Sequence, residues 1–393
     1  MKFILFAVFY LEFLGLRTII CSSSSDSELL MAKVIFRTGQ ELPPAEEALK
    51  KFLHERYTFD IEPFNTTGLK EEGKIDMYNF GAKIRRWYKG KLFNKHKPAE
   101  AKIKIESTSN EECQESAKYV RDGVFKNSFN KKNPQSTVEK TSSDELLTYF
   151  YKNDKCKAKS RMNGVPYKPI DFRFVQSTRN KLVEELKINL YPKGPIASNS
   201  PDPHPIKAQH IWKIYEYFQA KRFEKTLLPD WLTENMMFDM EESNKLFMRE
   251  FLKWDYIKYT SGGGVFANLI LDEFNKKISN NNNQPVLQLL CAQEIIVATA
   301  ISALTNSKSR ICDKNIDIGV VKHGTALIAE LHKKNSEYYV KVFLWNPDAD
   351  EPKQIKYGNC NNGECTFEMF QEMLKNSAIT EEKLKTSVYC NKS

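Results

Sequence analysis

Two short, mainly apolar runs in this chain each end abruptly in polar residues. The run 33–36 is followed by Arg37 and Thr38, and the run 286–292 is followed by Gln293 and Glu294. Such runs are typical of buried strands in a parallel sheet. Because ligand sites in open α/β sheets form just beyond the carboxyl ends of the strands, these polar residues are the first candidates for a functional site.

The rest of the pattern predicts further strands and helices around such a sheet. Apolar residues at helical spacing, among them Met77, Phe80, Ile84 and Trp87, predict an amphipathic helix over 75–92. Other helices are expected over 45–56, 110–125, 211–223, 265–278 and 295–304, and other strands over 103–105, 325–330 and 338–345. The last two strands alternate in polarity, and we expect them to pair near the far edge of the sheet.

The character of the chain changes between 151 and 259. Five prolines between 192 and 205 break it into loops, and aromatic-rich helices follow. The glycine run 262–264 then leads back into a helix. This run lacks the Lys-Ser/Thr pair that completes a phosphate-binding loop, so we interpret it as a return between two domains.

The N-terminal segment 1–21 has a lysine, an apolar stretch and then small residues, a pattern typical of a secretory signal peptide. Glu12 and Arg17 interrupt the apolar stretch, which argues against the alternative of a membrane anchor of about 20 apolar residues. No other segment is long enough to span a bilayer. We therefore expect a secreted protein, with a lysosomal location as the alternative.

Composition places the chain among ordinary globular proteins, with 393 residues, 41% apolar and 28% charged. The net charge of +9 is spread along the sequence among acidic neighbours, and no DNA- or RNA-binding signature is present. A solvated basic surface is expected rather than nucleic-acid binding, and neither a metal nor a cofactor is predicted.

Several segments, taken in order, resemble the histidine acid phosphatase family. Segment 37–43 reads Arg-Thr-Gly-Gln-Glu-Leu-Pro where the family has Arg-His-Gly-x-Arg-x-Pro, and Gln293-Glu294 stands where it has His-Asp. Further similar segments are Ile103 to Thr108, Ser116-Ala117, Gly263 to Val265 and the loop Cys360 to Cys365. The resemblance implies an α/β fold of the phosphoglycerate mutase-like type: a mostly parallel sheet flanked by helices over 22–150 and 260–393, with a helical cap subdomain over 151–259.

The resemblance also implies a mechanism, and this chain lacks most of its parts. In the family a histidine attacks phosphorus, an acid protonates the leaving group, and arginines with a second histidine neutralise the phosphate. Arg37 matches the first arginine of the family. Thr38 stands at the position of the nucleophile, and Glu41 and Glu112 stand at the positions of the other two arginines. Gln293 replaces the second histidine.

Glu294 stands for the general acid, with a side chain one methylene longer. The remaining histidines of the chain are not expected at strand ends that face the cleft; they are His54, His96, His204, His210, His323 and His332. We therefore expect no functional catalytic residue of the family type.

The resemblance further implies disulfides Cys360–Cys365 and Cys156–Cys390. Cys113, Cys291 and Cys312 have no evident partners, and Cys113 and Cys291 are expected as buried free thiols flanking the site, although a bond between them is conceivable. Sequons at Asn65 and Asn391 fit a secreted glycoprotein.

Three functions remain open. The first is a secreted, inactive phosphatase homologue that acts by binding an unknown ligand or protein. In a sharper form, the cleft has inverted its charge and accepts a cationic or hydroxyl-rich molecule. The second is an active acid phosphomonoesterase with displaced residues, for which Glu41, Glu112 and Glu294 offer carboxylates. The third is a venom-type or effector protein that engages a host partner. A homodimer is possible.

Overall fold

The structure is a computed structural model of the 393-residue chain. The residues that it describes are 27–41, 68–93, 98–130, 137–149, 181–186, 188–189, 208–223, 227–253, 262–279, 284–305, 321–355, 360 and 363–386.

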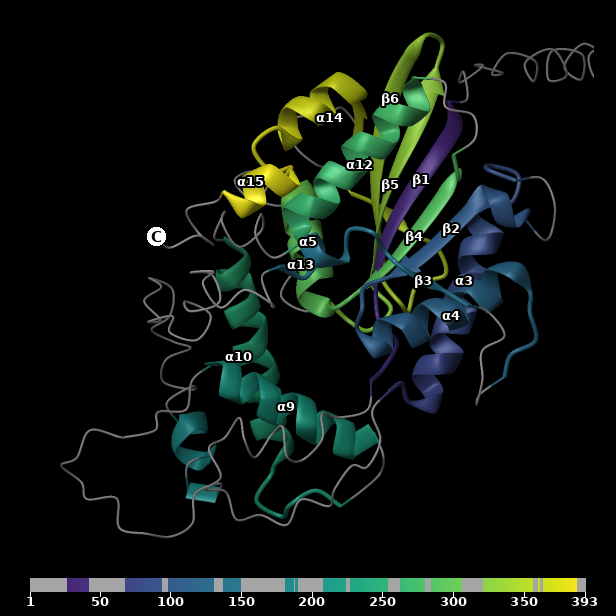
Figure 1. The fold of residues 1–393 in the computed structure, drawn as a ribbon. Coiled ribbons are helices and arrows are strands. Elements are labelled where there is room, and N and C mark those ends of the chain that lie inside the picture. The colour runs from purple at the N-terminus through teal and green to yellow at the C-terminus, as the bar shows by residue number, and fades with distance from the viewer. Residues whose placement is uncertain are drawn as a thin grey trace, which may run out of the picture.

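An eight-stranded mixed sheet forms the centre of the described chain (Figure 1). Its strands are β1 (Glu28–Arg37), β2 (Ile103–Ser107), β3 (Glu139–Lys140), β4 (Leu287–Ala292), β5 (Ala326–Lys334), β6 (Glu337–Trp345), β7 (Lys353–Gln354) and β8 (Glu364–Thr366). The order is β3-β2-β4-β1-β5-β6-β7, and β8 also pairs with β6.

The sheet has a parallel half and an antiparallel half. Strands β3, β2, β4 and β1 pair in parallel, whereas β5, β6, β7 and β8 join by antiparallel pairing. The predicted α/β architecture is confirmed. One expected detail is wrong: β5 lies directly beside β1, away from the edge, and this placement matters for the site.

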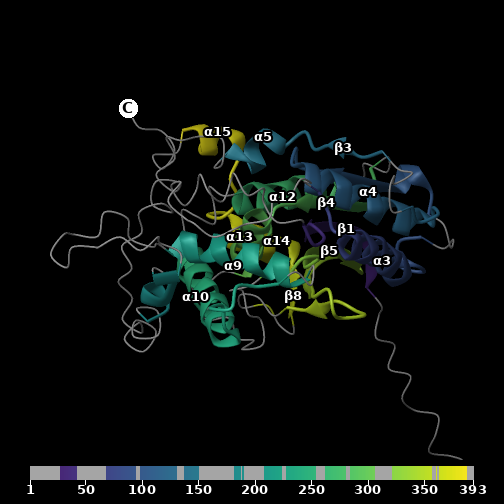
Figure 2. The same cartoon turned by 90° about the horizontal axis from the view of Figure 1, so that it is seen from below.

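Helices cover both faces of the sheet (Figures 1 and 2). The described helices are α3 (Glu71–Tyr88), η1 (Glu100–Lys102), α4 (Glu111–Phe125), α5 (Asp144–Leu147), α9 (Ala208–Phe223), α10 (Glu234–Lys253), α12 (Gly263–Ile278), α13 (Glu294–Thr305), α14 (Phe367–Leu374) and α15 (Glu381–Lys385). Helices α3 and α4 pack on one face through a core that includes Phe36, Ile84 and Val120. Helices α12, α13 and α14 pack on the other, around Ile35 and Ile296.

Helices α9 and α10 have a hydrophobic cluster of their own. Ile214 and Phe218 of α9 pack with Met236 and Met240 of α10. The end of α10 joins the main core through Leu252. These helices belong to the segment predicted as a cap, and the division into core and cap stays a prediction.

Local sequence explains where helices α4 and α12 begin. The Asn110 side chain accepts a hydrogen bond from the backbone N–H of Cys113 and so caps α4. Gly262 precedes α12 with φ +95, a conformation that favours glycine, and a Cβ there would lie 2.9 Å from the Leu147 carbonyl oxygen. The glycine run is therefore a helix start. The helix expected over 45–56 lies outside the described residues.

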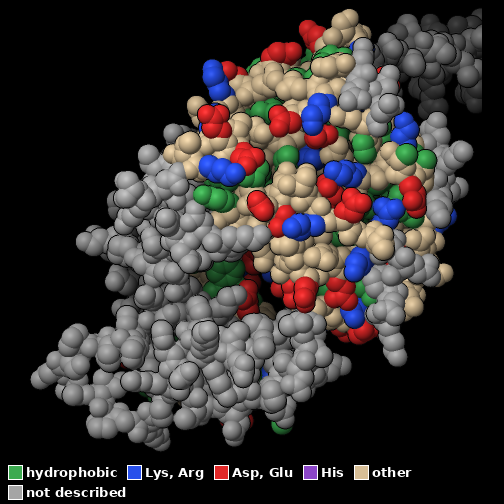
Figure 3. All heavy atoms as spheres, viewed as in Figure 1, with side chains coloured by type: hydrophobic (Ala, Val, Ile, Leu, Met, Phe, Trp, Pro, Cys, Tyr) green, Lys and Arg blue, Asp and Glu red, His purple; other side chains and the backbone are tan. Residues whose placement is uncertain are grey.

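The described surface carries both signs of charge. Figure 3 shows lysine and arginine side chains interspersed with aspartate and glutamate over this face of the α/β core. Such mixing agrees with a solvated surface. In the part of the chain that the structure describes, no helix has the length and apolar character needed to cross a membrane.

Candidate functional site

The candidate site lies where β1, β2 and β4 end side by side. Arg37 at the end of β1 pairs with Ala292 of β4, and Ser107 at the end of β2 pairs with Cys291. The segments that leave these strands therefore begin next to one another. Sequence reasoning expected this juxtaposition, and the structure brings Arg37 and Glu294 into contact.

Arg37 is buried, and its guanidinium is held by groups of this chain. Its Nη2 lies 3.1 Å from Oε2 of Glu294 and 3.5 Å from Nε2 of His323. Its Nη1 donates to the carbonyl oxygen of Val321. The Nε atom is buried with no hydrogen-bond partner among the described residues. Arg37, which the resemblance predicts as a former phosphate-binding residue, is thus engaged by groups of this chain.

Thr38, which the resemblance places at the position of the family's nucleophile, is completely buried. Its hydroxyl donates a hydrogen bond to Oε1 of Glu41. The loop that follows is fixed from both sides, because the Gly39 N–H donates to Ser116 Oγ at 3.0 Å and the Lys70 N–H donates to the Gln40 carbonyl at 2.9 Å. Glu41 therefore lies beside Thr38.

Carboxylates gather around this loop. Burial raises the pKa of Glu41, while Arg37 and the hydrogen bond from Thr38 act in the opposite direction. The negative charges of Glu112 and Glu216 raise the pKa further. Glu112 lies in the first turn of α4 and Glu216 lies on α9, so carboxylates from three segments act on the same place. Sequence reasoning missed Glu216, because nothing in its local pattern relates α9 to the strand ends.

Gln293 and Glu294 begin α13. The Gln293 carbonyl accepts the N–H groups of Ile296 and Val297 at 3.0 and 3.2 Å. Glu294 lies in the first turn of α13, where a negative charge interacts favourably with the helix dipole. The same carboxylate therefore stabilises the helix start and the Arg37 guanidinium.

His323 overturns the expectation that no histidine would lie at a strand end facing the site. It precedes β5, and because β5 runs antiparallel to β1, the start of β5 lies beside the end of β1. The Gly324 N–H donates to the Thr38 carbonyl at 3.0 Å and fixes this approach. Burial and the nearby Arg37 hold the pKa of His323 well below its usual value. The ring is thus neutral, and its Nε2 accepts from Arg37.

A cavity of about 300 Å³ adjoins His323 on the α3 side of the loop. It is lined by Gln40, by Asp76 and Lys83 of α3, and by Asp348. This cavity is separate from the carboxylates Glu41, Glu112 and Glu294, which do not line it.

The cysteines that flank the site are free thiols. Cys113 and Cys291 are both buried and unbonded. Burial, and next the adjacent Cys113 thiol, raise the pKa of Cys291 well above its usual value, so it is inert as a thiolate. The predicted disulfide Cys360–Cys365 is present. The positions Cys156, Cys390, Cys312, Asn65 and Asn391 lie outside the described residues.

No group of three or more histidine, cysteine, aspartate or glutamate side chains that could hold a metal ion occurs within the described ranges.

Comparison with known families agrees with this architecture. The family model of the histidine phosphatase superfamily (branch 2) matches residues 54–344. This chain belongs to that superfamily. The matched residues begin after the segment 37–43, where the replacement of the family's nucleophile and second arginine stays a prediction. Membership in this superfamily thus rests on the rest of the chain.

Relatives with curated names include acid phosphatase-like proteins of Xenopsylla cheopis. "Acid phosphatase-like protein XcAP-3" is 22% identical over 331 residues, which covers 81% of this chain and 83% of the relative. "Acid phosphatase-like protein XcAP-2" is 23% identical over 340 residues, which covers 81% and 84%.

Solved structures with the same fold include bacterial phytases. The Klebsiella sp. ASR1 phytase superposes with a TM-score of 0.64 at 16% identity, covering 90% of this chain and 97% of the phytase. The Hafnia alvei phytase in complex with myo-inositol hexakis sulphate also gives 0.64, at 11% identity and with 93% and 99% covered. At these identities the likeness establishes the fold alone.

Proposed function

We propose that this superfamily member is a secreted binding protein that does not hydrolyse phosphate esters. The observation that carries the proposal is the ion pair between Arg37 and Glu294, 3.1 Å apart and largely buried. At an effective dielectric of 20, two unit charges at this distance attract by about 5 kcal/mol before desolvation is counted. A phosphate would have to displace Glu294 to use this arginine.

The nucleophile's position supports the same proposal. Thr38 is a weak nucleophile, and its hydroxyl is already committed to Glu41. Glu41 is a possible base, but its charge repels the phosphate that the hydroxyl would attack. Phosphoryl transfer depends on positive charge around the equatorial oxygens, and carboxylates surround this position instead.

His323 is the natural candidate for a displaced nucleophile in an active phosphatase. Its Nε2 faces the Arg37 guanidinium at 3.5 Å and accepts a hydrogen bond from it. The lone pair that would attack phosphorus is therefore occupied. This geometry disfavours the alternative of a working phosphomonoesterase.

The ligand class follows from the charges that remain. With Arg37 engaged by Glu294, the carboxylates of Glu41 and Glu112 give this place a negative character. A ligand with an ammonium group would relieve their mutual repulsion. We propose that these carboxylates at the strand ends bind an organic amine, with hydroxyl groups of the ligand as additional donors to them.

Secretion is part of the proposal. The signal-peptide pattern of 1–21 and the disulfide Cys360–Cys365 support it, because disulfides form and persist in oxidising compartments. Fluorescence of a tagged chain in cells, with and without 1–21, would test it: retention of the full chain in the cytosol would contradict secretion.

Calorimetric titration of the secreted protein with a series of aryl alkyl amines and with inorganic phosphate tests the ligand class. We expect amines to bind and phosphate to bind weakly or not at all. A matched pair of variants locates the site: Glu112→Gln should weaken amine binding, whereas Glu111→Gln, its exposed neighbour in the same helical turn, should not. Tighter binding of phosphate than of every amine would refute the proposed ligand class.

A further inference from the structure

Lys33 is a buried lysine in the middle of β1, on the same strand as Arg37 but outside the site described above. It faces α12 and is only 7% exposed. Its Nζ donates to Oε1 of Gln288 at 2.7 Å, and Gln288 in turn donates to Oε2 of Glu273 at 2.9 Å. Lysine is almost never buried without a direct ionic partner. Here the hydrogen-bond partner in the described chain is an amide oxygen, which leaves two N–H bonds of the ammonium unused.

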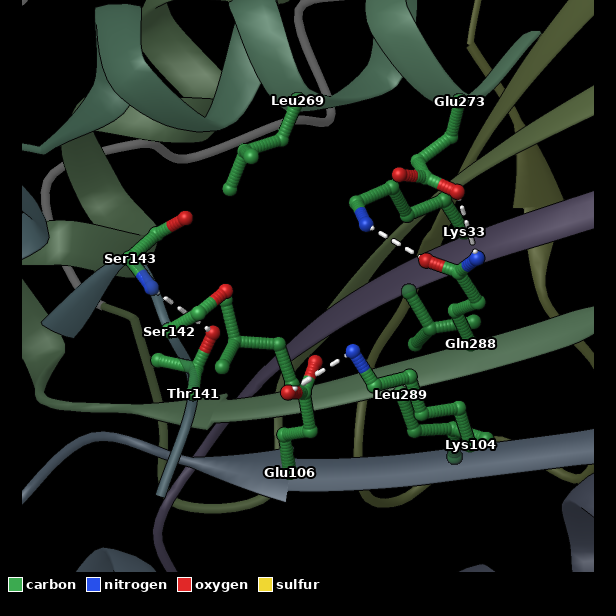
Figure 4. Close-up of a pocket in the computed structure, with 12 residues that line it drawn as sticks. Lys33, Lys104, Glu106, Thr141, Ser142, Ser143, Leu269, Glu273, Gln288 and Leu289 are labelled. Carbon is green, nitrogen blue, oxygen red and sulfur yellow. Dashed lines mark hydrogen bonds and ion pairs between the residues drawn. The ribbon is translucent and has the colours of Figure 1, made fainter. Parts of the chain in front are cut away.

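The free side of Lys33 faces a cavity of about 50 Å³ (Figure 4). Strands β1, β2 and β4 form its floor, α12 contributes Leu269 and Glu273, and the turn 141–143 closes one side. Figure 4 shows the amino group of Lys33 directed into this space, with Glu106 across from it. Ser142 at the rim is exposed, so the cavity borders on solvent.

Lys104 lines the same cavity but has a different environment. Its Nζ lies 2.9 Å from the carboxylate of Glu106, and its side chain is 45% exposed. It is thus a partly exposed lysine with a direct carboxylate partner, which Lys33 lacks. The two residues pair with the same Gln288 position on neighbouring strands, which makes Lys104 a matched internal control.

The environment of Lys33 activates its amine. Burial lowers the pKa of Lys33 to about 8, with Glu273 and Glu106 opposing this shift and Lys104 and Lys276 adding to it. At pH 7.4 about a fifth of such an amine is neutral, compared with roughly one in a thousand for an ordinary lysine. A desolvated, neutral lysine is the form that attacks carbonyl carbon.

We propose that Lys33 is a reactive amine that captures short hydroxy-aldehydes as a Schiff base in this cavity. The volume admits a few water-sized groups at about 10–15 Å³ each, which matches a molecule of about four non-hydrogen atoms. The hydroxyls of Thr141 and Ser143 suit a hydroxylated ligand rather than a hydrocarbon.

The proposed reaction is a condensation. The Nζ lone pair forms a bond to the aldehyde carbon, and the carbonyl oxygen takes a proton to give a carbinolamine. Loss of that hydroxyl as water then leaves a carbon–nitrogen double bond. Glu106, across the cavity, can carry the proton between nitrogen and oxygen. No oxidant or reductant is required, and hydrolysis reverses the step.

Reductive trapping on the native full-length chain tests this proposal. The protein is incubated with glycolaldehyde and sodium cyanoborohydride at pH 7.4, and adducts are quantified by peptide mass spectrometry. The neutral fraction alone favours Lys33 over an ordinary lysine by on the order of 200-fold. Allowing for restricted access, we expect Lys33 to be modified at least about tenfold faster than Lys104.

Two controls keep the result interpretable. In urea-denatured protein the preference for Lys33 should vanish, because both lysines then have ordinary surroundings. A Leu269→Phe variant, which fills part of the cavity, should slow modification of Lys33 and leave Lys104 unchanged. Modification of Lys33 no faster than Lys104 in the native chain would overturn the proposal. This test does not depend on any ligand of the carboxylates at the strand ends.

Discussion

Replacing Glu294 with glutamine should free Arg37 to bind an anion. The side chain keeps its size, but the ion pair at 3.1 Å is lost. The gross attraction of about 5 kcal/mol is largely offset by desolvation of both groups. A charge-assisted hydrogen bond from Arg37 to an incoming oxyanion is worth about 1.5–3 kcal/mol. Since about 1.4 kcal/mol corresponds to a tenfold change, we predict roughly 10- to 100-fold tighter anion binding.

Isothermal titration with tungstate measures this gain. Wild type, Glu294→Gln and the control Glu111→Gln are compared at one ionic strength, because salt screens exposed charges. Glu111 also lies in the first turn of a helix but is exposed, so its variant reports the effect of removing a helix-terminal charge alone. The repulsion from Glu41 and Glu112 is present in all three proteins and cancels in the comparison.

The reasoning would be refuted if Glu294→Gln bound tungstate no better than the control. Arg37 would then be unavailable to ligands for a different reason, such as its bond to the Val321 carbonyl. A thermal melt of each variant checks that the fold is intact, and we expect the Glu294→Gln variant to melt at a lower temperature because a buried charge loses its partner.

Three further predictions concern pH and backbone strain. Because the pKa of Glu41 is raised, its carboxylate should protonate earlier than usual as pH falls, so amine affinity measured by calorimetry should decrease toward acid pH; an unchanged affinity would contradict this. Gly262→Ala should lower the unfolding free energy, measured in urea, by at least about 1 kcal/mol more than Gly90→Ala does. Both glycines have positive φ, but only a Cβ at Gly262 would meet a backbone oxygen, so equal losses would contradict this prediction. The folded pKa of Lys33, about 8, is below its usual 10.5, so the unfolded chain binds more protons between these values. The unfolding free energy of wild type, relative to that of Lys33→Met, should therefore rise by on the order of 3 kcal/mol from pH 8 to 10.5. Parallel profiles of unfolding free energy against pH for the two proteins would contradict this prediction.

Sequence reasoning located the centre of the site because strand ends are local signals. An apolar run followed by Arg37, and another followed by Glu294, were enough to place both residues at one candidate site, with Glu41, Glu112 and Glu294 left open as partners of Arg37. The structure pairs Arg37 with Glu294. Parallel strands carry their carboxyl ends to one edge, so this inference needed no long-range information.

The residues that were missed depend on long-range pairing. His323 reaches the site because β5 pairs antiparallel with β1, and no local pattern specifies that partner. Glu216 acts on Glu41 from α9, although the two residues are 175 positions apart in the sequence. Lys33 was expected as the first residue of a strand, whereas β1 begins at Glu28 and places Lys33 in its buried middle. In each case, contacts between segments far apart in the sequence decide the environment of the residue, and the local sequence pattern does not predict them.

Hydrolysis of a chromogenic aryl phosphate at acid pH tests the central claim most directly. Purified wild type is assayed beside a variant that restores the family residues: Thr38→His, Glu41→Arg, Glu112→Arg, Gln293→His and Glu294→Asp. We predict no turnover by wild type and measurable turnover by the restored variant. Turnover by wild type that survives removal of contaminating phosphatases and is lost in Thr38→Ala would contradict the account.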